Sequence, residues 1–186
     1  VSMHLPFPGI HNVSNALAAI VVARQLDIHI DEISGALRNL SPLAQRSEII
    51  NLPNEITLIN DCYNSNPLAL ESMLRVLGEW PSKGQRILVA GEMLELGPTA
   101  SEWHRKLGEM MARIGQVDWL LAVQGEAQGF IQGACQAGFL SSRTRFFEKA
   151  EQAGELLASL TKPKDIVLIK GSRDVHLEKV VERVLR

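Results

Sequence analysis

Short apolar runs and helical patterns alternate along most of the chain. Runs rich in apolar residues predict strands at 48–52, 55–59, 86–90, 119–123, 145–147 and 165–169. Helices are predicted at 68–79, 101–114, 126–137, 149–160 and 175–185. The first two strands form a hairpin around Pro53 and Asn54. The alternation that follows is typical of an α/β fold, in which a mostly parallel sheet carries helices on both faces.

The first forty residues are different, because their pattern is helical throughout. Asn12 or Ser14 is expected to cap a helix that runs to about Gln25, and Asp31 a second helix that ends near Arg38. Two helices without a strand do not make an independent domain of this size. We therefore expect residues 1–42 to be the last helices of another domain, and residues 43–186, after Ser41-Pro42, to form the α/β domain.

Composition narrows the class of protein. The 186 residues are 46% hydrophobic and 22% charged, and the net charge is −2, so the broad basic field of a nucleic-acid-binding protein is absent. The two cysteines, Cys62 and Cys135, are too few for a disulfide framework or a zinc site, which favours a reducing compartment. Apolar runs such as 16–23 are too short to cross a bilayer. We expect a cytoplasmic protein without a membrane span, and, because the chain begins at Val1 without an initiator Met, a piece of a longer protein.

Polar side chains gather in the loop that follows the strand ending near residue 59. In an open α/β sheet, ligands bind beyond the carboxyl ends of the strands. Asp61 could hold a ribose hydroxyl or an ammonium group, or it could cap the helix that Pro67 opens. Asn64 and Asn66 fit either ligand binding or turn chemistry. Tyr63, the one tyrosine of the chain, lies in this polar loop, which favours a functional role.

Two further predicted strands are followed by loops with candidate ligand-binding residues. Gly91 to Gly97 follows one strand, and Lys170-Gly171-Ser172-Arg173 follows the last strand. Gly171 lets backbone approach a ligand, while the Lys and Arg supply positive charge for a carboxylate or phosphate. Ser172 could cap the helix that follows, so a solvated basic turn is the alternative. Three polar strand ends predict one shared site.

Other candidates are weaker when taken singly. His11 and Asn15 are four residues apart and share a helix face that could contact adenine, although a capping cluster is equally consistent. Arg46 precedes the first strand, where clefts between domains bind ligands. His104 lies on a predicted helix, where a lone histidine is more often structural. The sequence has no phosphate loop, no Gly-x-Gly-x-x-Gly and no metal-ligand cluster, so the Rossmann-like pattern does not imply NAD, and no metal ligand is assigned.

Taken in order, four motifs resemble the C-terminal portion of the Mur ligase family. They are Gly9-Ile10-His11-Asn12-Val13-Ser14-Asn15, Asp61-Cys62-Tyr63-Asn64-Ser65-Asn66-Pro67, Gly91-Glu92-Met93-Leu94-Glu95-Leu96-Gly97 with His104, and Lys170-Gly171-Ser172-Arg173. The resemblance is nearest to members that add D-alanyl-D-alanine to UDP-N-acetylmuramoyl-tripeptide in peptidoglycan precursor synthesis. It implies a three-domain monomer that uses ATP and Mg²⁺ to make an acyl phosphate, with the Mg²⁺ ligands and phosphate loop in the domains upstream.

The resemblance also implies roles for particular residues. His11, Asn12 and Asn15 face the adenine of ATP, while Arg46 and Asp61 are the catalytic pair that reaches the nucleotide when the domains close. A further set is implied to bind the substrate, namely Tyr63, Asn64, Asn66, Lys170, Ser172 and Arg173.

The chain departs from the family pattern at two places. Gln45 stands where the family usually has Gly before the arginine, and Asp174-Val175-His176 stands where Met residues are usual. The chain alone is expected to be inactive. Another Mur-type or folylpolyglutamate-type ligase, or a non-catalytic Rossmann-like binding module, remains an alternative.

Overall fold

A computed structural model describes residues 2–114 and 116–185. The chain divides into two compact units, Val1–Leu43 and Ala44–Arg186, and each is described by itself. In the part of the chain that is described, none of the helices has both the length and the apolar character needed to cross a membrane.

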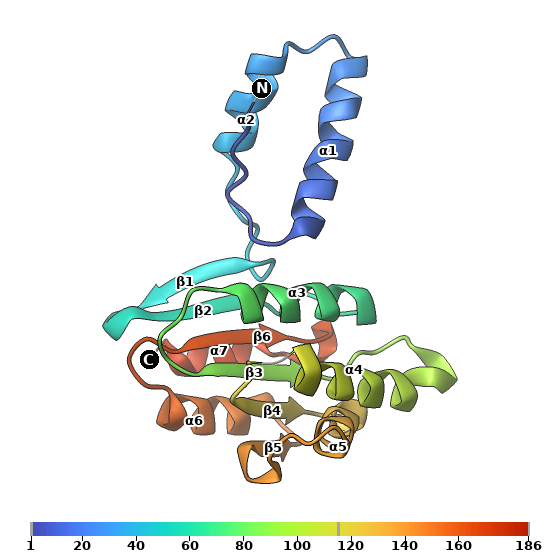
Figure 1. Ribbon diagram of the computed structural model, residues 1–186, viewed down its shortest axis with the longest axis vertical. Coiled ribbons are helices and arrows are strands. Elements are labelled where there is room, and N and C mark those ends of the chain that lie inside the picture. The colour runs from blue at the N-terminus through green and yellow to red at the C-terminus, as the bar shows by residue number, and fades with distance from the viewer. Residues whose placement is uncertain (1, 115, 186) are drawn as a thin grey trace. The chain divides into compact units, whose positions relative to one another are not determined.

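The first unit contains α1 (Ile10–Gln25) and α2 (Ile30–Arg38) (Figure 1). The predicted caps are wrong for both helices. The chain enters α1 through Gly9, whose φ of 91° is left-handed, while the Asn12 side-chain amide donates to the carbonyl of Pro8 at 2.7 Å. His29, not Asp31, caps α2, because its Nδ1 accepts from the Asp31 backbone N–H at 3.4 Å.

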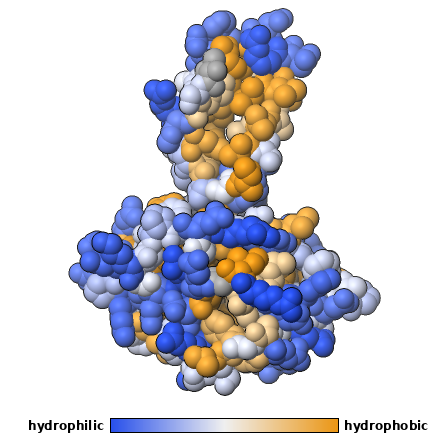
Figure 2. Space-filling model, viewed as in Figure 1, coloured by the Kyte–Doolittle hydropathy of each residue, from blue (hydrophilic) through white to orange (hydrophobic). Residues whose placement is uncertain are grey.

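An apolar stripe runs along α1. None of the described residues of α1 is buried, whereas α2 buries Ile33 and Leu37. The stripe consists of the exposed residues Ile10, Val13, Leu17 and Val21, whose spacing places them on one helix face. Figure 2 shows hydrophobic residues gathered over this helix. An apolar helix face of this kind is characteristic of a helix that packs against further protein.

The second unit holds a six-stranded sheet. In spatial order its strands are β1 (Glu48–Leu52), β2 (Ile56–Asp61), β6 (Ile166–Lys170), β3 (Arg86–Gly91), β4 (Trp119–Val123) and β5 (Thr144–Phe147) (Figure 1). β1 pairs antiparallel with β2, and the other neighbouring pairs are parallel. The predicted mostly parallel sheet is therefore confirmed.

Helices cover both faces of the sheet. One face carries α3 (Pro67–Glu79), α4 (Ala100–Ile114) and α5 (Gln128–Gln136), and the other carries α6 (Ala150–Leu160) and α7 (Glu178–Val184). Successive strand residues point to opposite faces. Leu168 accordingly lies in the core under α3, α4 and α5, while Ile169 lies in the core under α6 and α7. Every residue of β6 is buried, as expected for a central parallel strand.

Glycines lie in the contact between α4 and α5. Gly129 and Gly133 both face α4 at close range. A Cβ at Gly133 would collide with the carbonyl oxygen of Arg105, and a Cβ at Gly108 would collide with that of Phe130. These glycines therefore allow the two helices to pack closely, and they fix α4 over the sheet.

The strand order gathers the polar loops. β6 lies between β2 and β3. The chain leaves β2 and β3 for α3 and α4 on one face of the sheet, and it leaves β6 for α7 on the other face. The register aligns Lys170 with Asp61 on β2 and with Ala90 on β3. The loops after β2, β3 and β6 therefore start side by side, at the kind of sheet edge where α/β proteins bind ligands.

Candidate functional site

A buried ion pair joins the ends of β2 and β6. Lys170 Nζ donates to Asp61 Oδ2 at 2.6 Å and to the Asn64 carbonyl at 3.0 Å. The Lys170 and Asp61 side chains are only 4% and 13% exposed. Removing two charges from water is costly unless their hydrogen bonds are good, and this pair is short and further bonded. The Asp61 carboxylate thus binds an ammonium group of the chain itself.

The second oxygen of Asp61 extends the link to the segment before β1. Asp61 Oδ1 accepts from the Ser47 backbone N–H at 2.8 Å, and the Ser47 hydroxyl lies 3.4 Å away. Asp61 does not cap α3. That cap is Asn66, whose Oδ1 accepts from the Ala69 N–H at 2.9 Å. Asn64 Oδ1 accepts from the Ser65 N–H at 2.8 Å, so both asparagines have turn roles.

Cys62 lies beside Asp61 but is poorly suited to nucleophilic chemistry. Its side chain is fully buried among the residues under α6 and α7. This burial raises the pKa of the Cys62 thiol to about 12. Because only the thiolate is a good nucleophile, Cys62 is a core residue at neutral pH.

Two guanidinium groups lie against Tyr63, which is 43% exposed. Arg46 Cζ lies 4.0 Å and Arg173 Cζ 5.5 Å from the centroid of the tyrosine ring. Arg173 Nη1 also donates to Gln45 Oε1 at 2.6 Å, and the Tyr63 N–H donates to the Gln45 carbonyl at 3.0 Å. Among the described residues neither guanidinium has a carboxylate partner within salt-bridge distance. Their fixed forks of donors suit a carboxylate or a phosphate.

Ser172 fixes the loop after β3 against the loop after β6. Its hydroxyl oxygen accepts from the Leu94 N–H at 2.9 Å, and its own N–H donates to the Glu92 carbonyl at 3.0 Å. The expectation that Ser172 caps the following helix is wrong, because this side chain is 4% exposed and turns inward to Leu94. Gly171 likewise approaches Gly91, since a Cβ at Gly171 would lie 2.9 Å from Gly91 Cα. The close backbone approach that Gly171 allows is made here to the neighbouring strand end.

His104 on α4 has the structural role that is more usual for a lone helical histidine. Its Nε2 lies 2.9 Å from the backbone N of Met93, and its Nδ1 lies 2.7 Å from the Ala100 carbonyl. Met93 N–H can only donate, so Nε2 is the acceptor and Nδ1 carries the proton. The ring is fully buried, and this burial lowers the pKa of His104 below its usual 6.5.

The remaining predicted residues lie on the first unit. His11 and Asn12 are half-buried and Asn15 is exposed, all three on α1. His11 and Asn15 both lie in α1, so their spacing of four residues places them on one helix face, as predicted. Asn12 uses its amide nitrogen on Pro8, so its oxygen is the atom available to accept from a ligand.

Sequence reasoning assigned no site role to Gln45 and Ser47. Between them these residues contact three of the predicted residues, Asp61, Tyr63 and Arg173. Only the register of the hairpin reveals the position of Ser47. The hairpin register pairs Glu48 with Asn60, so the residue before Glu48 lies beside Asp61. No comparable sequence signal points to the side chain of Gln45.

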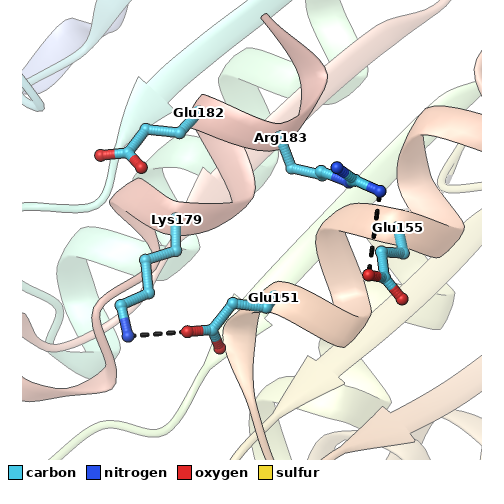
Figure 3. A pocket seen from close by; sticks show the side chains of 5 residues that line it. All are labelled: Glu151, Glu155, Lys179, Glu182 and Arg183. Carbon is cyan, nitrogen blue, oxygen red and sulfur yellow. Dashed lines mark hydrogen bonds and ion pairs between the residues drawn. The ribbon is translucent and has the colours of Figure 1, made fainter. Parts of the chain in front are cut away.

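A separate groove lies between α6 and α7. It has a volume of about 300 Å³ and is lined by Glu151, Glu155, Lys179, Glu182 and Arg183 (Figure 3). Lys179 pairs with Glu151 at 2.7 Å, and Arg183 pairs with Glu155 at 3.8 Å. The hydrogen bond from Lys179 lowers the pKa of the Glu151 carboxyl. These charges largely satisfy one another, so the groove offers less binding chemistry than the strand-end site.

Comparison with known proteins points to the family that the sequence motifs resemble. The family model described as "Mur ligase, glutamate ligase domain" matches residues 45–173. UDP-N-acetylmuramoyl-tripeptide–D-alanyl-D-alanine ligase of Escherichia coli K12 is 34% identical over 97% of this chain and 38% of its own length. The chain therefore spans about two fifths of the length of the curated relatives it matches.

Solved structures agree with the sequence comparison. A crystal structure of MurF from Acinetobacter baumannii matches 98% of this chain and 39% of its own, with a TM-score of 0.87 and 28% identity. The MurF ligase of Thermotoga maritima, solved in complex with ADP, matches 96% of this chain and 38% of its own, with a TM-score of 0.79 and 26% identity.

The Asp61–Lys170 pair gives a stability prediction. Asp61→Asn leaves the buried Lys170 ammonium without its counter-charge, so we expect the free energy of unfolding to fall by about 3 kcal/mol or more. Combining it with Lys170→Met should restore part of the loss, because no buried charge then remains. Lys179→Met, which breaks an exposed pair, serves as the control and should cost less than about 1 kcal/mol. Urea unfolding measures all four proteins; equal losses in Asp61→Asn and in the control would contradict the role of the pair.

His104 gives a pH prediction. Its pKa is lower in the folded than in the unfolded protein, so the unfolded state binds a proton first as the pH falls. The stabilisation from neutral His104 is fully present above pH 6.5 and is lost below it, by at most about 1.4 kcal/mol per pH unit. We expect His104→Asn to flatten the fall in unfolding free energy between pH 6.5 and 5. An unchanged slope in the variant would assign that fall to other groups.

Proposed function

The chain belongs to the Mur ligase family, and from this premise we propose that it is the C-terminal portion of an ATP-dependent ligase that adds D-alanyl-D-alanine to UDP-N-acetylmuramoyl-tripeptide. The observation that carries the proposal is the match, along nearly the whole chain, to relatives named as that ligase. The ligase would act in peptidoglycan precursor synthesis, in the cytoplasm and as a monomer. The free state of Cys62 and Cys135 favours that compartment.

The chemistry of the second unit supports the substrate assignment. The incoming dipeptide ends in a carboxylate, and Arg173, with Lys170 and Ser172 behind it, presents the donors that such a group requires. We assign the dipeptide carboxylate to Arg173. Lys170 and Ser172 are held by Asp61 and Leu94, so their part is to position the loop that carries Arg173.

The nucleotide is assigned to the residues that face it in the family. When bound, ATP with Mg²⁺ supplies the phosphoryl group that activates the substrate carboxylate as an acyl phosphate. Arg46 is exposed and lacks a carboxylate partner among the described residues, which suits a phosphate oxygen. His11, Asn12 and Asn15 are proposed to line the adenine, with the Asn12 oxygen as acceptor.

The Asp61 carboxylate is less available to a nucleotide than the Arg46 guanidinium is. Both of its oxygens already accept hydrogen bonds, from Ser47 and from Lys170, so its charge is compensated inside the unit. In the described ranges 2–114 and 116–185, no group of three or more His, Cys, Asp or Glu side chains could hold a metal ion. From the resemblance to the family, we propose that the Mg²⁺ ligands lie in the remaining domains of the protein. Tyr63, Asn64 and Asn66 are proposed to shape the cleft once the domains close.

We further propose that residues 1–42 are the last helices of the central ATP-binding domain. Support comes from the apolar stripe of α1, which stays exposed among the described residues of the first unit. A helix face of this composition gains stability when further protein covers it, at about 25 cal/mol per Å² of apolar surface. The part of the protein beyond this chain would supply that cover.

The activity is tested by phosphate release. The full-length protein is supplied with ATP, Mg²⁺ and UDP-N-acetylmuramoyl-tripeptide, with and without D-alanyl-D-alanine, and the 186-residue chain is assayed beside it. We expect dipeptide-dependent release from the long protein and none from the short one. Release that depends on glutamate or another amino acid instead would move the proposal to a different ligase of the family. Turnover by the short chain would contradict its proposed inactivity.

The domain assignment is tested by two substitutions in the stripe. Leu17→Gln and Val21→Gln should each lower the free energy of unfolding of the full-length protein by about 2 kcal/mol, because they place an amide in a buried face. The same changes in the 186-residue chain should alter stability by less than about 0.5 kcal/mol. Gln25→Ala on the same helix should be neutral in both. Equal effects in the two proteins would show that the stripe stays exposed.

A further inference from the structure

Gln45 has a backbone conformation that its residue type disfavours. Its φ is 63°, in the left-handed region that glycine adopts readily and other residues seldom adopt. Ser47, two residues on, has a φ of 50°. These two residues flank Arg46 and turn the chain on either side of it. A contact that glycine could not make would offset the cost of this backbone conformation.

The side chain of Gln45 makes such a contact. Its backbone N–H donates to Glu48 Oε2 at 3.0 Å, and its carbonyl accepts from Tyr63 N–H at 3.0 Å. A glycine could keep both of these bonds. The third bond, from Arg173 Nη1 to Gln45 Oε1 at 2.6 Å, requires the side-chain amide. It joins positions that are 128 residues apart in the sequence.

We propose that Gln45 is a positioning residue that holds the Arg173 guanidinium beside Tyr63, ready for the carboxylate of the incoming dipeptide. This inference rests on the proposed ligase function and deepens it. Arg173 is exposed, so without Gln45 its long side chain would sample many rotamers. Holding one rotamer before the ligand arrives reduces the entropy lost on binding.

The amide is chemically suited to this task because it is neutral. A carboxylate at the same place would bind Arg173 more tightly, but it would also neutralise the charge that attracts the substrate. Gln45 Oε1 engages one N–H of the five in the guanidinium, and the remaining donors stay available for a carboxylate. Arg46 lies against the same Tyr63 ring, so both positive charges are kept near one place.

Three variants separate positioning from a general effect on folding. Gln45→Gly removes the amide and relieves the left-handed backbone, and Gln45→Glu keeps the reach of the side chain but adds a negative charge. Gln124→Gly is the matched control, because Gln124 also has a left-handed φ, of 70°, and lies after β4. Both glycine variants should therefore equal or exceed the wild type in thermal stability.

The first measurement needs no ligand. The 186-residue chain contains one tyrosine, so ¹³C-labelled tyrosine reports on the Tyr63 ring alone in an NMR spectrum. In Gln45→Gly, loss of the Arg173 guanidinium from beside Tyr63 should shift the ring resonances. Gln124→Gly should leave them at their wild-type positions. Ring resonances that Gln45→Gly leaves unchanged would overturn the proposal.

The second measurement uses the full-length ligase. We expect Gln45→Gly to raise the KM for D-alanyl-D-alanine about tenfold, with kcat and the KM for ATP within about twofold of the wild type. Gln45→Glu should raise the dipeptide KM at least as much, and Gln124→Gly should leave it unchanged. A dipeptide KM within twofold of the wild type in Gln45→Gly would overturn the proposal, even if the ring resonances shift.

The two proposals fail in different ways. If phosphate release by the wild type does not depend on the dipeptide, the proposed function is wrong, and the assignment of Arg173 to its carboxylate is wrong with it. The NMR comparison then still decides whether Gln45 holds Arg173. If release does depend on the dipeptide but Gln45→Gly behaves as the wild type, only the role of Gln45 is overturned.

Discussion

The strand-end site depends on the buried pair between Asp61 and Lys170. Each side chain would be costly to bury without the other, so the pair fixes how β2 and β6 end relative to one another. The same carboxylate holds Ser47, and the same ammonium holds the Asn64 carbonyl. Through these bonds one interaction orders the segment before β1 and the loop after β2. Those are the segments that bring Arg46 and Tyr63 together.

Other buried polar side chains repeat this pattern. Ser172 satisfies the Leu94 N–H, and His104 satisfies the Met93 N–H, so the loop after β3 has its backbone donors paired on two sides. The donors that face solvent are of a different kind, because they are the guanidiniums of Arg46 and Arg173. A framework of internal bonds thus presents two exposed, permanently charged side chains. Gln45 limits the freedom of one of them.

Much of the fold could be predicted from the sequence, because the strands of the second unit are apolar runs and its sheet is buried on both faces. The ends of these strands differ from prediction by at most two residues. The hairpin was harder to predict, since Asn54 and Glu55 both have φ angles of 61° and delay β2 to Ile56. A shift of one residue in an antiparallel pair exchanges its two faces. The position of Ser47 beside Asp61 follows from that register, which residue types do not reveal.

The sequence predicted that the polar loops lie together, but not which of their residues bind one another. Sequence identified the loops that carry chemistry, because polar residues follow apolar strands. It could not tell which polar groups satisfy one another, since Asp61 has the same letter whether it meets Lys170 or a ligand. A family motif leaves the same question open. A residue of the motif can either stabilise the loop or contact the substrate, and the motif does not say which. Burial separates the two kinds here: Asp61, Lys170 and Ser172 are enclosed, and Arg46 and Arg173 are exposed. Ligand selectivity should therefore follow changes in the exposed arginines and in the contact that orients Arg173, whereas changes in the enclosed residues should act through the stability of the sheet edge.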